Sequence, residues 1–156
     1  MAVLRVSHIG ICVADLARSL VFYRDVLGFE QRSELAVEAA DADRLLELED
    51  VKLNAVYLER DGTRIELLQY DSPETIGEAT PRAMNARGLT HISLRVADLP
   101  ALIDELRAKG VDVLEATWID YRDAGIGAVF ITDPDGTRIE LVESPGDATA
   151  LPGEST

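Results

Sequence analysis

Hydrophobic and polar positions follow the same order in the two halves of the chain. Residues 4–13 are rich in β-branched and apolar side chains, which is typical of a strand. Apolar side chains then recur at helical spacing, which predicts a helix capped by Asp15 and ended by Gly28. The equivalent features of the second half are a strand at residues 89–96, a cap at Asp98 and a terminating Gly110. Each half therefore begins with a strand and a helix.

Three further strands are expected after each predicted helix. In the first half they cover residues 29–33, 51–59 and 63–70, and in the second half residues 111–114, 128–132 and 137–143. Aspartate-glycine pairs before the last strands favour hairpin turns. The first half also contains "AVEAADADRLLELED", residues 36–50, for which we predict a short helix or an excursion. The pattern of each half is therefore βαβββ.

Two repeated segments show that the halves are copies of one plan. The segment "HIGICVADL" at residues 8–16 matches "HISLRVADL" at residues 91–99, and "DGTRIEL" occurs at residues 61–67 and 135–141. The first pair is offset by 83 residues (8 to 91) and the second by 74 (61 to 135), so the second half is nine residues shorter. We predict a first module at residues 1–70, a linker at 71–88, a second module at 89–143 and a flexible tail at 144–156.

The fold class predicted from this order is α+β. A βαβββ half is too small to close a core alone, so two modules are expected to pair as a curved, mixed sheet that bears a cleft. Equivalent residues of the two modules would then converge about a pseudo-twofold axis. The pairing can occur within one chain or across a dimer, and we expect a homodimer.

The charge of the chain narrows the classes of partner. There are 29 acidic residues against 15 basic ones, giving a net charge of −14, which repels phosphate backbones and anionic lipids. No apolar run is long enough for a membrane helix, and the N-terminal segment lacks the pattern of a signal peptide. We therefore expect a cytoplasmic protein that binds a small molecule and a metal cation, with no nucleic acid or membrane partner.

Four polar residues interrupt the apolar strands at equivalent positions. They are His8, Glu66, His91 and Glu140, and the two histidines are the only ones in the chain. Two imidazoles and two carboxylates form a ligand set for one divalent transition metal, such as nickel, cobalt, zinc, iron or manganese. Alternatively, each histidine is a hydrogen-bonded structural residue and each glutamate pairs with the arginine two positions earlier, Arg64 or Arg138. The duplication favours the metal.

The repeated segments, together with "FYRDVLGF", resemble the vicinal oxygen chelate superfamily over residues 3–143. That superfamily includes glyoxalase I, methylmalonyl-CoA epimerase, extradiol dioxygenases and the fosfomycin and bleomycin resistance proteins. The resemblance implies that its metal ligands fall on His8, Glu66, His91 and Glu140. A fourth ligand disfavours a dioxygenase, because those relatives use two histidines and one glutamate. The linker "DSPETIGEATPRAMNARG" is more similar to that of the epimerases.

The resemblance implies a metal-dependent isomerase or epimerase that transfers a proton next to a carbonyl. Glu66 and Glu140 are then the candidate catalytic bases. The alternatives are a glyoxalase I-type lactoylglutathione lyase and a non-catalytic binding or resistance protein. Arg32 and Arg122 are candidates to hold a phosphate. The residues expected to line the substrate pocket are Asn54, Tyr57, Trp118, Tyr121 and Arg122.

Overall fold

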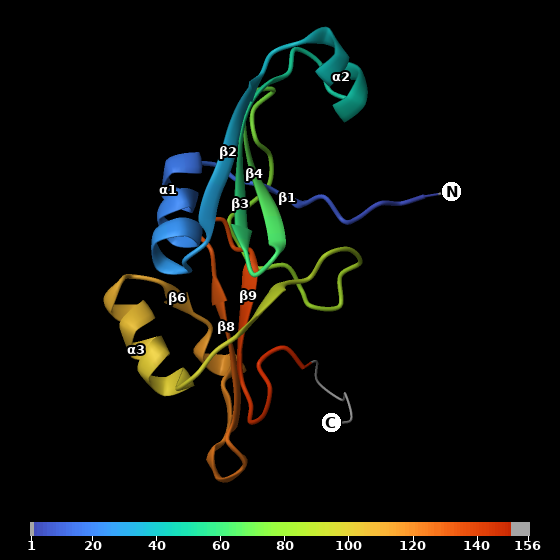
Figure 1. Ribbon diagram of the computed structural model, residues 1–156. Helices are drawn as coiled ribbons and strands as arrows, with labels where there is room; N and C mark the ends of the chain where they lie inside the picture. Colours follow the sequence, from blue (N-terminus) through green and yellow to red (C-terminus); the bar gives the residue numbers. More distant parts are fainter. Residues whose placement is uncertain (1, 151–156) are drawn as a thin grey trace. The chain divides into compact units, whose positions relative to one another are not determined.

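A computed structural model describes residues 2–150 of the chain (Figure 1). The chain divides into two compact units, Met1–Glu78 and Ala79–Thr156. The boundary falls within the predicted linker. The last part of the predicted tail, residues 151–156, lies outside the described residues.

The first unit is a four-stranded mixed sheet with the predicted βαβββ order. Its strands are β1 (Ile9–Cys12), β2 (Glu30–Val37), β3 (Lys52–Arg60) and β4 (Thr63–Ser72), arranged in the order β1-β4-β3-β2. The β1 strand runs parallel to β4, and the other neighbours are antiparallel. The side chains of Leu58, Ile65 and Leu67 are fully buried, so one face of this sheet forms the core of the unit.

The helix of the first unit begins and ends as the sequence predicts. The Asp15 side chain accepts a hydrogen bond from the Arg18 amide, which caps α1 (Leu16–Leu20). The helix continues as a wider π-helical segment over Val21–Val26. It ends at Gly28, whose φ of 73° is the left-handed conformation that glycine adopts without steric cost.

The predicted excursion between β2 and β3 contains a short helix, α2 (Ala40–Leu46). Figure 1 shows α2 at the far end of these two long strands. Ala42 of this helix packs in a hydrophobic cluster with Leu53 and Ala55 of β3, and Tyr57 and Tyr70 pack against the cluster. The excursion therefore covers part of the sheet face that carries Tyr57.

The second unit repeats the same plan with an additional strand. It contains β5 (Ile92–Arg95), α3 (Leu99–Ala108), β6 (Asp112–Val113), β7 (Ile119–Tyr121), β8 (Ile126–Thr132) and β9 (Arg138–Glu143). The main path of the sheet is β5-β9-β8-β6, and β7 also pairs with β8. Leu99, Ile103 and Leu106 of α3 are buried, as the predicted helical stripe requires. Asp98 caps this helix by accepting a hydrogen bond from the Ala101 amide.

Several predicted boundaries are wrong. The strands predicted at residues 4–13 and 89–96 are shorter, and both histidines lie immediately before β1 and β5 rather than within them. The strand predicted at residues 29–33 continues to Val37, and the one at 63–70 continues to Ser72. The sequence did not predict β7 or the 3₁₀ turns Glu115–Thr117 and Arg122–Ala124 that flank it. None of the helices within residues 2–150 is both long and apolar enough to cross a membrane.

Candidate metal-binding residues

The first unit brings His8 and Glu66 together. Glu66 lies between the fully buried Ile65 and Leu67 on β4, so alternation along the strand turns its side chain to the opposite face. His8 enters that face from the residue before β1, whose strand pairs in parallel with β4. The Nε2 atom of His8 is 3.1 Å from Oε2 of Glu66, and the Glu66 side chain is only 13% exposed.

The second unit repeats this arrangement with His91 and Glu140. Glu140 lies between the buried Ile139 and Leu141 on β9. The Nε2 atom of His91 is 3.5 Å from Oε2 of Glu140. Each histidine is therefore paired with the glutamate of its own half, as the duplicated sequence predicts.

The residue before each histidine fixes the orientation of the ring. The Ser7 hydroxyl is 3.1 Å from Nδ1 of His8, and the Thr90 hydroxyl is 2.9 Å from Nδ1 of His91. A hydrogen bond at one ring nitrogen orients the other nitrogen toward a metal, which is how outer partners support metal-binding histidines. The sequence interpretation missed Ser7 and Thr90, although a hydroxyl residue precedes both histidines.

The donor atoms suit a divalent transition metal. Two ligands bound side by side at about 2.1 Å from one ion are roughly 3 Å apart. The separations in the two pairs, 3.1 and 3.5 Å, are close to that value. Within each unit, the described residues gather no third histidine, cysteine, aspartate or glutamate around the pair. Each pair by itself therefore offers one imidazole and one carboxylate among the described residues.

The aromatic residue beside each pair differs between the units. The Tyr57 ring lies edge-on to His8 with a centroid distance of 5.3 Å, and Phe130 lies edge-on to His91 at 5.5 Å. Tyr57 is paired across the strands with Glu66, and Phe130 is paired with Glu140. A hydrogen bond to Glu66, burial and the charge of Glu66 raise the pKa of the Tyr57 hydroxyl to about 12. The Phe130 ring has no hydroxyl, so it provides no such bond to Glu140.

The two arginines of the repeated segment bind elsewhere than to the candidate ligands. Arg64 donates from Nε to Glu59 at 2.7 Å. Arg138 lies over the Phe130 ring at 5.6 Å and donates to the Arg82 carbonyl. These contacts replace the glutamate–arginine pairs of the alternative interpretation, in which the repeated segment is only a stabilised hairpin.

A cavity of about 430 Å³ opens beside His8 in the first unit. The residues that line it are Ser7, His8, Arg32, Ser33, Tyr57, Glu59 and Arg64. Tyr57, a predicted substrate residue, therefore lies in a cavity with a predicted metal ligand. Asn54 lies on the other face of β3, since its position differs from that of Tyr57 by an odd number, and it donates to Asp71 at 2.9 Å.

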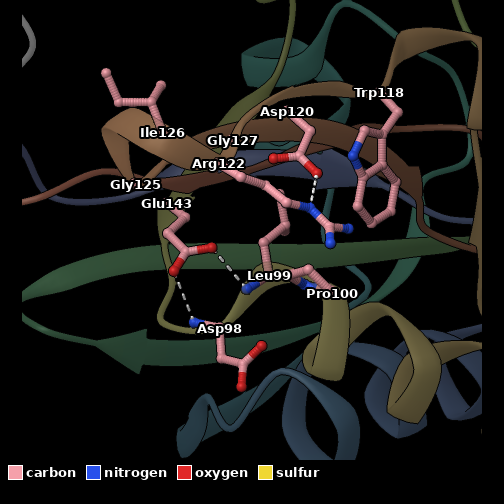
Figure 2. A pocket seen from close by; sticks show the side chains of 10 residues that line it. All are labelled: Asp98, Leu99, Pro100, Trp118, Asp120, Arg122, Gly125, Ile126, Gly127 and Glu143. Atoms are coloured by element: carbon pink, nitrogen blue, oxygen red, sulfur yellow. Dashed lines mark hydrogen bonds and ion pairs between the residues drawn. The ribbon is translucent and has the colours of Figure 1, made fainter.

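The structure separates two of the predicted substrate residues from Glu140. Trp118 and Arg122 line a cavity of about 440 Å³ in the second unit, next to Leu99 and Gly127 (Figure 2). Gly127 is paired with Asp120, and its neighbour Ala128 belongs to the opposite face. Glu140 is paired with Phe130, on the Ala128 face, so the sheet lies between Glu140 and this cavity. Tyr121 is paired with Ile126 and is on the Glu140 face.

The polar groups of that second cavity are engaged with each other. Figure 2 shows the Glu143 carboxylate accepting hydrogen bonds from the amides of Asp98 and Leu99, at 3.1 and 2.9 Å. Arg122 donates from Nε to Asp120 at 2.6 Å, and this bond with the charge of Asp120 raises the pKa of Arg122. These contacts cap α3 and stabilise the β7–β8 connection.

Comparison with known proteins agrees with the two repeated βαβββ halves. The model of the glyoxalase/bleomycin resistance protein/dioxygenase superfamily matches residues 5–141. The chain belongs to this superfamily. Its members include metal-dependent epimerases, lactoylglutathione lyases and fosfomycin resistance enzymes that act on small molecules. The α+β fold predicted from the sequence is confirmed.

Two relatives and one solved structure show how the superfamily match extends over the chain. A 2-epi-5-epi-valiolone epimerase from Actinomyces sp. is 31% identical, covering 92% of this chain and 81% of that protein. A lactoylglutathione lyase from Haemophilus influenzae is 25% identical, covering 95% and 98%. The structure of a glyoxalase family protein from Bacillus cereus aligns with a TM-score of 0.80 at 22% identity, covering 94% of this chain and 97% of that one.

Proposed function

We propose that this protein is a divalent-metal-dependent epimerase or isomerase that moves a proton next to a carbonyl of a small substrate. The observation that supports it is the duplicated pair, in which Nε2 of each histidine faces the glutamate of the same unit. Two such pairs supply two imidazoles and two carboxylates, and the carboxylates balance the charge of a divalent ion. His8, Glu66, His91 and Glu140 are the proposed ligands.

The ion, when bound, would polarise the substrate oxygen atoms and stabilise the negative charge that develops on them. The chain itself must then remove the proton from carbon. A carboxylate that stays fully engaged is a poor base, so the base is a glutamate that is free to turn toward the substrate. Glu66 is held by Tyr57, whereas Glu140 faces the Phe130 ring. We assign removal of the proton to Glu140, which is left protonated. Delivery of a second proton from the opposite side falls to Glu66, which carries that proton at the start of the step and ends as a carboxylate.

The relatives support an epimerase more than a lyase. The valiolone epimerase is 31% identical to this chain, and the lactoylglutathione lyase is 25% identical. A lyase would use the same ligands and the same kind of proton transfer on a thiol adduct of a 2-oxoaldehyde. A binding protein of this fold would need neither the ligands nor the base.

Metal content and hydrogen exchange test the proposal together. Protein purified without added metal and then titrated with nickel, cobalt, zinc, iron and manganese should bind about one ion for each set of four ligands. Metal-loaded protein in deuterated water should exchange the hydrogen next to the carbonyl in at least one member of a panel of cyclic polyhydroxy ketones, 2-hydroxy ketones and acyl thioesters. The variant His91→Ala should lose both the metal and the exchange.

The outcomes separate the three functions. Exchange with inversion at one carbon supports the epimerase, and turnover only of a thiol adduct of a 2-oxoaldehyde supports the lyase. Protein that takes up no transition metal contradicts the proposal and favours a binding function. The matched control is Glu105→Gln, which removes an exposed carboxylate from α3. This control should bind metal and exchange hydrogen as the parent protein does.

A further inference from the structure

An arginine pair lies in the first unit, in the cavity beside His8. Arg32 and Arg64 both line that cavity, and both bind the carboxylate of Glu59 between them. Arg64 reaches Oε2 of Glu59 at 2.7 Å, and Arg32 reaches Oε1 at 3.4 Å. We name Arg32, Arg64 and Glu59 the arginine clamp.

A β-bulge brings Arg32 into the clamp. The pairing between β2 and β3 shifts between Gln31, opposite Leu58, and Ser33, opposite Tyr57. Arg32 is thus an extra residue on β2, and such bulges redirect side chains. Its guanidinium lies within 3.1 Å of Glu30 and within reach of Glu59, on the face that carries Tyr57. The chain therefore departs from regular pairing at the position that supplies the second arginine.

The clamp retains capacity to bind another group. Each guanidinium carries five N–H donors, and the bonds to Glu59 and Glu30 use only part of them. The Arg32 and Arg64 side chains are 53% and 40% exposed, and Glu59 is 19% exposed. The hydrogen bond from Arg64, with the charges of both arginines, holds the pKa of Glu59 below its usual range. Glu59 therefore stays charged and fixes both guanidinium planes.

The local charge contrasts with that of the whole chain. The cavity is lined by two arginines and one glutamate, while the chain carries a net charge of −14. Paired guanidinium groups suit oxyanions because their planar donors match the oxygen atoms of a carboxylate or phosphoryl group. Glu59 and Glu30 offset the charge of the two arginines, so the cluster would select an anion through its directed N–H donors.

We infer that the arginine clamp binds an oxyanion, a carboxylate or phosphoryl group, carried by the substrate on the part remote from the reacting carbon. The inference rests on the proposed function, since it makes this cavity part of the substrate site. The cavity has about 430 Å³ and also contains His8, so one small molecule spans both ends. The clamp positions the substrate, and the glutamates move its proton.

The second unit supplies a matched control. Arg138 occupies the position of Arg64 in the other copy of the repeated segment, but its strand partner is Thr132 instead of a glutamate. Its guanidinium lies over the Phe130 ring and binds the Arg82 carbonyl. The variant Arg138→Gln therefore removes an equivalent charge without touching the clamp.

The test measures binding of simple oxyanions by calorimetry and by amide shifts in NMR spectra. Inorganic phosphate and acetate are titrated separately into metal-free protein, in which neither can bind a metal. The double variant Arg32→Gln/Arg64→Gln should weaken binding roughly ten- to a hundredfold. Arg64→Lys should weaken it less, because both positive charges remain and only the planar set of donors at position 64 is lost. Arg138→Gln should bind as the parent does. Tighter binding of phosphate than of acetate indicates a substrate with a phosphoryl group. Tighter binding of acetate indicates a substrate with a carboxylate.

Two results overturn the clamp. The first is that the parent protein binds neither phosphate nor acetate. The second is that the double variant binds the anions as tightly as the parent does, while its thermal unfolding transition is unchanged. Neither depends on metal, so failure of the clamp is distinct from failure of the proposed function. Once a substrate is found, the double variant should raise KM with little change in kcat, whereas a purely structural ion pair would leave KM unchanged.

Discussion

The two copies of "DGTRIEL" place their glutamates in different surroundings. In the first unit, Glu66 is paired with Tyr57 and accepts its hydrogen bond. In the second unit, the same strand position opposite Glu140 is Phe130, an aromatic ring without a donor. Both aromatic rings stand edge-on to the neighbouring histidine. The duplication thus preserved the histidine–glutamate pairs and the ring packing, and one copy lacks the hydroxyl that binds a carboxylate.

Two copies of one motif therefore need not have the same role. A carboxylate held by a phenol is suited to keep its position, and one beside an apolar ring is suited to move. The arginines of the repeat diverge in the same way, since Arg64 joins Glu59 and Arg138 stacks on Phe130. Identical residues acquired different partners because the strands beside them differ in sequence.

The largest expected effect comes from removing the proposed base. Glu140→Gln should lower the hydrogen-exchange rate roughly a thousandfold, within the usual range for loss of a general base. Glu66→Gln should reduce it less and should weaken metal binding as well. Exchange rates in deuterated water, measured at saturating metal, give both values. Equal losses in the two variants would contradict the assignment of different roles.

Packing should be nearly equal in the two units, because the buried face of the repeat is conserved. Ile65→Ala and Ile139→Ala each remove a fully buried side chain. Each should lower the free energy of unfolding by about 2–5 kcal/mol. Urea unfolding followed by circular dichroism measures the cost. A loss below about 1 kcal/mol in one variant only would show that the two cores are packed differently.

Exchanging the two aromatic residues should change which glutamate is restrained by a tyrosine hydroxyl. Tyr57→Phe removes the hydrogen bond to Glu66 and makes the first pair resemble the second. In a Glu140→Gln background, this change should restore exchange by roughly tenfold, because Glu66 becomes free to turn. Phe130→Tyr in the parent protein should slow exchange by a similar factor. No recovery in the double variant would show that Tyr57 does not restrain Glu66.

The smallest effect concerns the helix caps. Glu143 accepts from two amides at the start of α3, whereas Gln69 accepts only from the Leu16 amide at the start of α1, at 2.7 Å. Glu143→Gln should lower the free energy of unfolding by about 0.5–1 kcal/mol, through loss of a negative charge at a helix N-terminus. Gln69→Glu should raise it by a smaller amount, because Gln69 also donates to Asp71 at 3.3 Å and a glutamate would lose that bond. Thermal unfolding at low and high salt checks both, since salt should reduce each change.

Local signals in the sequence predicted most of the fold. The caps at Asp15 and Asp98, the left-handed Gly28 and the buried positions beside both glutamates depend on short-range spacing alone. The histidine–glutamate pairs were predicted because the repeat linked residues far apart in the chain. Convergence of the two pairs on one ion stays a prediction.

The features that the sequence did not predict depend on strand pairing. Trp118 and Arg122 were expected near the substrate, but the register of β7 on β8 directs them to the opposite face from Glu140. Arg32 was a candidate to hold a phosphate, but its pairing with Arg64 around Glu59 depends on a bulge in β2, and Arg32 and Glu59 are 27 positions apart in sequence. A single sequence contains no local signal for either register.

The helix α2 gives the first unit a wall that the second half, nine residues shorter, does not repeat. It packs through Ala42 against Leu53 and Ala55 of β3, on the sheet face of Tyr57. The sheet face that carries Glu66 therefore has a covering segment at one end, which the described part of the second unit does not repeat around Glu140. The two copies of the repeated segment thus differ in the shape of their surroundings as well as in the aromatic residue beside each glutamate.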